Sequence, residues 1–511
     1  MNETLRIPEE PKGLKWKLFG ICSKIDTQKV ALLLLLLLNC QIFYGVFSVA
    51  TTQSSLVALF YGKATVIRLI GFLGLLNWLV DIYCRVVVHG KAALRREFIR
   101  RVWVGILTWL LLWSFAAVFI SLDTDLAFFG GAYRYEGFVS FVAYAGIFMC
   151  ASQIRDEKYR KILLASVGIF STVLAGLTLL RELAHATFLM NRGSMVGAFS
   201  GTFINSNHYG YYLCVSMLVL VGLFTHAQKW QAKVAWGLCF AINAVMMLYN
   251  QTLGAYFALL LGFVLYAILF IVRKGIKKAW PILALFALLI LLSFVVNQHK
   301  MLDDIGYLVR ETKEAGSAIS SDSASSEEAQ SVTDKLGSGR GKLWKKTIQV
   351  ILEHPLMGVG TDNVQLYINY DIPHNEYLQI GANLGFPGLA AYLLALIVLF
   401  VFALKNTKNL SDCTLIAGVA VFVYCASAFT GISIPVATYQ LFLYMGLLNG
   451  WFRQKDDEAM LREKQEELQK TADDASAPSD EQKEGGDSEP GQPLPEDGET
   501  EPVTESSAGP E

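Results

Sequence analysis

Charged residues are scarce in this chain of 511 residues: Asp, Glu, Lys and Arg make up only 17% of it, and they gather in short stretches. Soluble globular proteins carry about 25% charged residues. Hydrophobic residues make up 53% of the chain. This balance excludes a soluble globular protein and predicts a chain that folds in lipid.

The chain also lacks cysteines in the expected outer segments and a cleavage site for a signal peptide. None of the eight cysteines falls in a segment that we expect on the outer side, which argues against a disulfide framework in an oxidising exterior. No small-residue cleavage site follows the first apolar run, which is preceded by the polar residues 1–28. We therefore expect no cleavable signal peptide, and the first run should act as a signal anchor.

Long apolar runs are what the chain has in abundance. A run of about 17 to 25 residues crosses a bilayer core of about 30 Å as a helix, and helices are required because unpaired backbone groups are too costly in lipid. We predict an all-α integral membrane protein with about twelve transmembrane helices. The predicted spans are 29–50, 64–88, 102–121, 136–153, 160–180, 208–226, 232–249, 254–272, 279–297, 382–404, 412–430 and 435–452.

Lys and Arg predict the orientation, because short loops rich in these residues stay in the cytoplasm. They cluster before the first span and in every second loop after it, which the predicted spans place on one side. Both termini of this multi-pass protein should then lie on the cytoplasmic side of the cytoplasmic membrane. We expect a cytoplasmic segment at 1–28, a transmembrane domain at 29–452, and a disordered acidic tail at 453–511 that begins with a helical extension at 455–470.

The large outer segment, 298–381, lies between the ninth and tenth predicted spans. Its part 316–339 is rich in Ser and acidic residues, which is typical of a mobile insert. Residues 335–346 then carry basic but no acidic side chains, on the side where such a cluster is disfavoured. Apolar residues recur at helical spacing in 341–353 (Trp344, Ile348 and Ile351), so this part should be an amphipathic helix on the membrane surface.

The basic residues of this helix allow two interpretations. They can bind anionic lipid headgroups, or Arg340 can grip a phosphate through two hydrogen bonds from its planar guanidinium group. The sequence Gly339-Arg340-Gly341 should form a turn that exposes Arg340 at the start of the helix. Pro355 should end the helix, and Gly358-Val359-Gly360 should form a turn.

His374 lies in the sequence Pro373-His374-Asn375-Glu376-Tyr377 at the mouth of the tenth span. A neutral imidazole can take a proton from a sugar hydroxyl near pH 7, although a lone interfacial His is more often structural. Other polar residues at span mouths on the same expected side favour a cavity that opens outward. They are Arg134, which lies between Gly131 and Gly137, and Arg192, Asn205 and Asn207.

In this order the motifs resemble the O-antigen ligase and O-antigen polymerase superfamily, over roughly residues 100–450. The resemblance rests on Gly-x-x-Arg-x-x-Gly, Asn-x-Asn, Ser-Gly-Arg followed by Trp, Pro-x-x-Gly-x-Gly, and His-Asn before a Gly-rich helix. It implies a GT-C-like bundle and a glycosyltransferase that joins a glycan from undecaprenyl diphosphate to an acceptor outside the membrane. The Ser-rich insert and the acidic tail depart from the family pattern.

The resemblance also implies roles for individual residues. His374 would be the base that activates the acceptor hydroxyl, and Arg340 would hold the diphosphate with help from Arg192. The residues expected to bind substrate are Arg134, Arg192, Asn205, Asn207, Lys342 and Asn375.

Departure of a lipid diphosphate requires positive charge, which either arginine or a metal ion can supply. Asp123-Thr124-Asp125 is similar to the Asp-x-Asp pair of metal-dependent relatives, but such a pattern is also common in loop caps. The resembled family does not depend on this pair. We expect a metal-independent enzyme without a cofactor, acting among membrane lipids and not on nucleic acid.

Two alternative functions stay open at this point. One is a transporter or flippase for lipid-linked glycans, although ion-coupled carriers need ionisable groups deep in their spans and the clear carboxylate here, Asp81, lies near the cytoplasmic end. The other is a protein O-oligosaccharyltransferase, because the resembled family includes enzymes that glycosylate Ser or Thr. The motifs do not separate a ligase from a polymerase, so a glycan, a lipid or the wall can be the acceptor.

Overall fold

The computed structural model describes residues 13–47, 52–186, 198–203, 205–297, 300, 303, 306–307, 309–310, 313, 326–369 and 372–476. The chain divides into two units, Met1–Asp457 and Glu458–Glu511. The described part of the second unit is the C-terminal stretch of helix α18, which ends at Ser476 and runs through the predicted helical extension. Arg192, the first part of the Ser-rich insert and most of the acidic tail lie outside the described residues.

Every regular element in the described residues is helical, which confirms the all-α prediction. The short helices are α1 (Leu14–Cys22), α4 (Lys91–Arg95), α6 (Thr124–Phe129) and α15 (Val364–Ile368). The longer ones are α2 (Thr27–Cys40), α3 (Gln53–His89), α5 (Val102–Val118), α7 (Phe138–Ala151), α8 (Glu157–Leu183), α9 (Ser206–His226), α10 (Trp230–Asn250), α11 (Leu253–Lys274), α12 (Trp280–Asn297), α14 (Ser326–Glu353), α16 (Glu376–Lys405), α17 (Asp412–Ala428) and α18 (Pro435–Ser476).

Several of these helices can cross a membrane. Among the described residues, 6 helices are long and apolar enough, and a pair bent by 84°, Lys91–Arg100 with Val102–Val118, brings the number to 7 if it forms one span. Shorter apolar helices lie in four further predicted spans: Thr27–Phe43, Phe138–Ala151, Trp280–Val296 and Asp412–Ala428. The chain is therefore a multi-pass membrane protein, and the number twelve stays a prediction.

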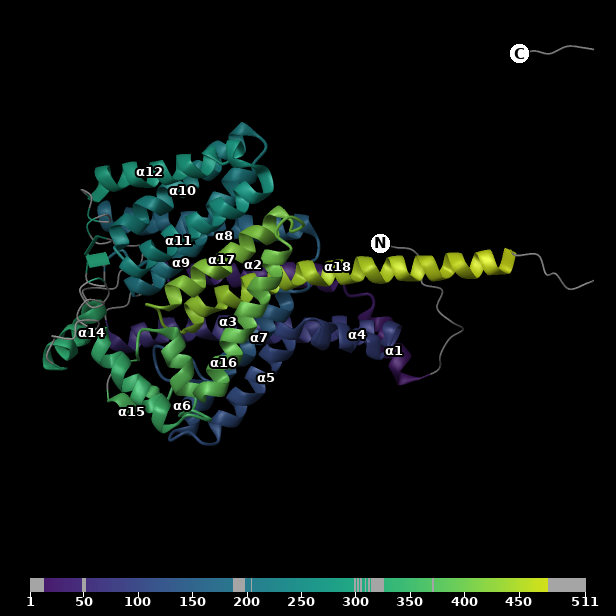
Figure 1. The fold of residues 1–511 in the computed structure, drawn as a ribbon, viewed down its shortest axis with the longest axis horizontal. Helices are drawn as coiled ribbons and strands as arrows, with labels where there is room; N and C mark the ends of the chain where they lie inside the picture. The colour runs from purple at the N-terminus through teal and green to yellow at the C-terminus, as the bar shows by residue number, and fades with distance from the viewer. Residues whose placement is uncertain are drawn as a thin grey trace, which may run out of the picture. The chain divides into compact units, whose positions relative to one another are not determined.

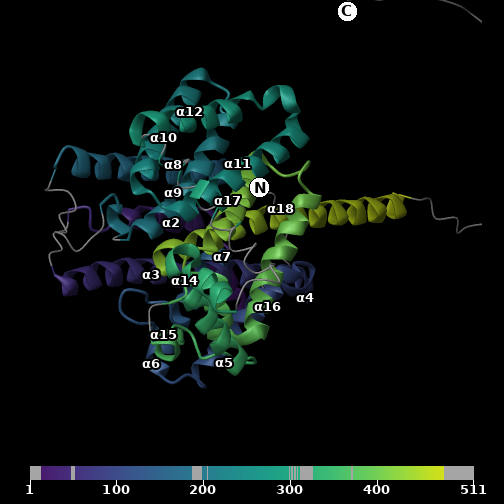
Figure 2. The same cartoon turned by 60° about the vertical axis from the view of Figure 1, so that its left-hand side comes forward.

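Close packing between helices organises the first unit (Figures 1 and 2). α9 lies in its interior, with side chains buried from His208 to Leu223. α3 and α7 lie side by side, and a Cβ atom on Gly146 would be 1.9 Å from the carbonyl oxygen of Gly71. The two backbones touch there because neither residue has a side chain, which is a common way for membrane helices to associate.

The two ends of the first unit carry different polar groups. We call the end that carries α6, α14 and α15 the α14 end, and the end with α1 and α4, on the right of Figure 1, the basic end. At the basic end Asp81 accepts from Arg85 (3.0 Å), Arg155 (3.0 Å) and Arg453 (2.6 Å). Asp81 thus serves as an ionic link between α3, α18 and the loop before α8.

Candidate functional site

Arg340 lies on α14, in the middle of a continuous helix. The prediction that Gly339-Arg340-Gly341 forms a turn at a helix start is wrong, because α14 begins at Ser326 and runs through this sequence. The helix ends at Glu353, before Pro355, as predicted. Packing against α16 and α15 supports helix formation here although two glycines flank Arg340.

The buried side of α14 also differs from the predicted apolar stripe. Leu343, Val350 and Ile351 are buried, whereas Ile348 is 45% exposed. Within the predicted stripe, the protein thus covers Ile351 but not Ile348, and the location of the helix on the membrane surface stays a prediction. Contacts with α16 and α15 decide which side of α14 is covered, and the sequence pattern alone does not contain them.

The sequence Pro355-x-x-Gly358-x-Gly360 docks the end of α14 onto α16. The N–H of Val359 donates to the carbonyl of Ala382 at 2.9 Å. Gly358 has a φ angle of 71°, and a Cβ atom there would lie 2.4 Å from the backbone of α16. A glycine is required for this approach. The docked turn fixes the path of the chain towards α15 and the start of α16.

His374 lies two residues before the first residue of α16 and has a strained backbone. Its φ angle is 48°, in the left-handed region that residues other than glycine rarely adopt. On one side, the carbonyl of Pro373 accepts a hydrogen bond of 2.8 Å from Trp344 Nε1. On the other side, Asn375 caps α16, with its Oδ1 accepting from the N–H of Leu378 at 3.1 Å. Strained backbone that its surroundings hold in place is concentrated at functional sites.

α14 brings Arg340 close to this turn, because Arg340 lies one helical turn before Trp344 on the same side of the helix. Arg340 Nη1 donates to the carbonyl of Thr430 at 3.1 Å. The hydroxyl of Tyr211, on α9, donates to the same oxygen at 2.5 Å. Asn207 lies one turn before Tyr211. The structure therefore gathers the candidate cation, the candidate base and the start of α9 at the α14 end.

Arg134 lies in the loop before α7 and faces a buried carboxylate. Its Nε is 3.4 Å from Asp362 Oδ1, and the N–H of Gly131 donates to Asp362 Oδ2 at 2.7 Å. Burial raises the pKa of Asp362 to about 6, although Arg134 and the Gly131 N–H act in the opposite direction. This pair joins two loops of the α14 end, so Arg134 has a structural partner in the protein.

The other predicted residues lie in varied surroundings. Asn205 is exposed and caps α9, with its Oδ1 accepting from the N–H of Asn207 at 2.8 Å. Lys342 is exposed on α14. Asp123 caps α6 by accepting a backbone N–H of that helix at 2.8 Å. Within the described part of the chain, no three or more His, Cys, Asp or Glu side chains are arranged to hold a metal ion.

Two buried glutamates, Glu136 and Glu376, were not predicted as functional residues. Each accepts hydrogen bonds from two hydroxyl groups: Glu136 from Tyr144 (2.6 Å) and Ser433, and Glu376 from Tyr392 (2.7 Å) and Tyr424 (2.8 Å). Neither forms an ion pair with a described basic side chain. A signal was present in the sequence, because each glutamate directly precedes an apolar run and lies within a motif that carried the family resemblance.

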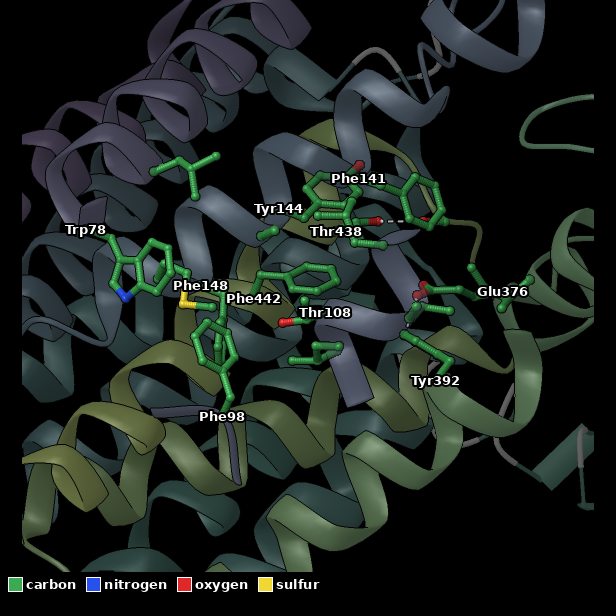
Figure 3. Close-up of a pocket in the computed structure, with 18 residues that line it drawn as sticks. Trp78, Phe98, Thr108, Phe141, Tyr144, Phe148, Glu376, Tyr392, Thr438 and Phe442 are labelled. Carbon is green, nitrogen blue, oxygen red and sulfur yellow. Dashed lines mark hydrogen bonds between the residues drawn. The ribbon is translucent and has the colours of Figure 1, made fainter. Parts of the chain in front are cut away.

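A cavity of about 180 Å³ adjoins Glu376, between α3, α5, α7, α16 and α18. Its walls are mainly aromatic and aliphatic. Figure 3 shows Trp78 and Phe98 on one side of it, and Glu376 and Tyr392 on the other. Apolar cavities of about 150 Å³ hold a benzene-sized group. This cavity has room for a segment of a hydrocarbon chain, with polar groups at one end.

Comparison with known proteins finds a family similarity over part of the chain. Residues 238–393 match the family model described as O-antigen ligase, and no curated protein matches the chain. The matched segment runs from α10 into α16 and contains Arg340, Trp344 and His374. It confirms the resemblance seen in the sequence and indicates a membrane enzyme of the ligase or polymerase type, which joins glycans. Over residues 238–393, this chain is similar to the O-antigen ligase family.

Proposed function

We propose that this enzyme transfers a glycan from an undecaprenyl diphosphate carrier to an acceptor on the outer face of the cytoplasmic membrane. The observation that carries the proposal is the placement of Arg340 and His374 at the α14 end, joined through Trp344. One group is a permanent cation and the other can accept a proton. The acceptor is a second glycan, a lipid or the wall.

Arg340 would stabilise the leaving diphosphate. The bond between the anomeric carbon of the donor sugar and the diphosphate oxygen breaks, and its electron pair leaves with the diphosphate. Arg340 donates to a neutral carbonyl, and it forms no ion pair with a described carboxylate, so its charge remains for a phosphate group. Guanidinium groups can supply this charge without a metal ion, so we propose a metal-independent reaction.

His374 would act as the base for the acceptor. The acceptor oxygen forms the new bond to the anomeric carbon while its proton passes to the imidazole, which later releases the proton to water. The products are the joined glycan and free undecaprenyl diphosphate. The held backbone of His374 supports this role, because a base must stay within hydrogen-bond reach of the proton that it takes.

The apolar cavity would receive part of the carrier's isoprenoid chain. Its aromatic and aliphatic walls suit a hydrocarbon, and its polar end at Glu376 is two residues from His374. The carrier is far longer than the cavity, so most of its chain would stay in the bilayer. This arrangement would leave the diphosphate at the α14 end.

The remaining predicted residues are proposed to line the path of the glycan and the diphosphate. Asn375 is adjacent to the base, and Asn207 lies one turn from Tyr211, which shares a carbonyl with Arg340. The other proposed lining residues are Arg134, Arg192, Asn205 and Lys342. The outer location of this site is supported by the arginine cluster at the opposite end, since basic residues favour the cytoplasmic side.

The test is the glycan that remains on undecaprenyl diphosphate in cells that lack the protein. These cells are complemented with wild type, His374→Ala, or His354→Ala, a matched control in the same segment whose ring contacts Tyr367. We expect carrier-linked glycan to accumulate without the protein and with His374→Ala, but not with His354→Ala. Accumulated single repeat units indicate a polymerase, and accumulated long chains indicate a ligase. An unchanged carrier pool in both the deletion and the His374→Ala strain would refute the proposal.

A further inference from the structure

Trp344 contacts the chain at the residue just before His374. Its indole N–H donates to the Pro373 carbonyl at 2.8 Å. This carbonyl belongs to the peptide group whose nitrogen is that of His374, so the hydrogen bond fixes the peptide plane on the N-terminal side of the histidine. Proline adds stiffness, because its ring locks its own φ angle.

The residue that follows His374 is also held in place. Asn375 is the N-cap of α16, and both its side chain and its carbonyl accept hydrogen bonds from the first turn of that helix. With the Pro373 carbonyl and Asn375 both held, His374 retains the φ angle of 48° that a free chain rarely adopts. Without one of the two restraints, the backbone can relax to negative φ, and this rotation swings the imidazole to a new direction.

We infer that Trp344 is a positioning residue: its indole N–H holds the Pro373 carbonyl and thereby keeps the His374 imidazole aimed at the acceptor hydroxyl. The inference rests on the proposed function, in which His374 is the base. Because Arg340 lies one turn away on the same helix, α14 sets both the cation and the direction of the base. A shift of one side chain by about 1 Å can slow an enzymatic step by about a hundredfold.

The chain offers a matched control in Trp113. This residue of α5 also donates its indole N–H to a backbone carbonyl of α16, that of Leu384, at 3.0 Å. Trp113→Phe and Trp344→Phe therefore remove the same kind of hydrogen bond and the same bulk, but only the second bond adjoins His374. Trp344→His, which keeps a ring N–H, serves as a second variant.

The experiment measures two quantities in detergent-solubilised protein. One is kcat and KM for the lipid-linked donor. The other is the rate at which diethyl pyrocarbonate modifies His374, followed by mass spectrometry of its peptide. For Trp344→Phe we expect kcat to fall about ten- to a hundredfold with KM within about twofold of wild type, and the modification rate of His374 to change severalfold. Trp113→Phe should leave both quantities near wild type, and Trp344→His should recover part of the loss.

Each other outcome overturns the inference in a recognisable way. An unchanged modification rate in Trp344→Phe and Trp344→His would show that Trp344 does not hold His374, whatever the activity. A raised KM with unchanged kcat would assign Trp344 to donor binding, and equal losses in Trp113→Phe would assign it to general packing. Full activity of His374→Ala would refute the proposed function itself. The positioning role of Trp344 would then be refuted as well.

Discussion

The buried Asp362 should make the stability of the protein depend on pH. Burial raises its pKa from the ordinary value of 3.8 to about 6. A carboxyl whose pKa is raised in the folded state favours folding in its protonated form, so this contribution is complete below about pH 3.8 and is lost as the pH rises through about 6. Each pKa unit corresponds to about 1.36 kcal/mol, so ionisation costs the folded protein about 3 kcal/mol.

Asp362→Asn tests this reasoning, because Asn resembles the protonated carboxylic acid in shape and charge. We expect the variant to be more stable than wild type by only about 1 kcal/mol at pH 4.5 and by up to about 3 kcal/mol at pH 8. The assay is the midpoint of thermal unfolding in detergent between these pH values. Asp123→Asn, which changes a helix cap that also contacts the segment around Asp362, should keep the pH dependence of wild type. Equal pH dependence of wild type and Asp362→Asn would refute the account.

Three further predictions concern activity. Arg340→Ala should slow glycan transfer about a hundredfold or more. Arg340→Lys should recover only part of the lost rate, because lysine lacks the planar guanidinium group. Unchanged transfer by Arg340→Ala at equal expression would remove Arg340 from the mechanism. A chelator should leave transfer intact, and a sensitive enzyme would point to Asp123 and Asp125 instead. Deletion of residues 460–511 should preserve transfer in isolated membranes, and an inactive but inserted truncation would show that the tail has a part in the reaction.

The sequence predicted the helical class and most helix positions, since apolar length and the cost of unpaired backbone groups decide both. It also predicted that α14 ends before Pro355 and that His374 stands at the mouth of a long apolar helix. These features depend on local residue types. The family resemblance followed from the order of the motifs, and the matched segment contains the ones around Arg340 and His374.

The features that sequence reasoning missed depend on contacts between distant segments. The start of α14 and its buried side are set by α16, and the strain at His374 depends on Trp344, a residue on another helix. Glu136 accepts a hydrogen bond from the distant Ser433, and Glu376 accepts one from Tyr424 on α17, so their burial without a cation could not be inferred from their immediate neighbours.

The partner of Arg340 differs from those of the arginines at the basic end. At the basic end, Arg85, Arg155 and Arg453 bind Asp81, so carboxylates offset their charge. At the α14 end, Arg340 donates to a neutral carbonyl, and no described carboxylate pairs with it. A carbonyl can orient a guanidinium group without cancelling its charge. In the proposed reaction, an arginine held in this way is oriented while no described carboxylate offsets its charge, which suits it to stabilise a leaving diphosphate.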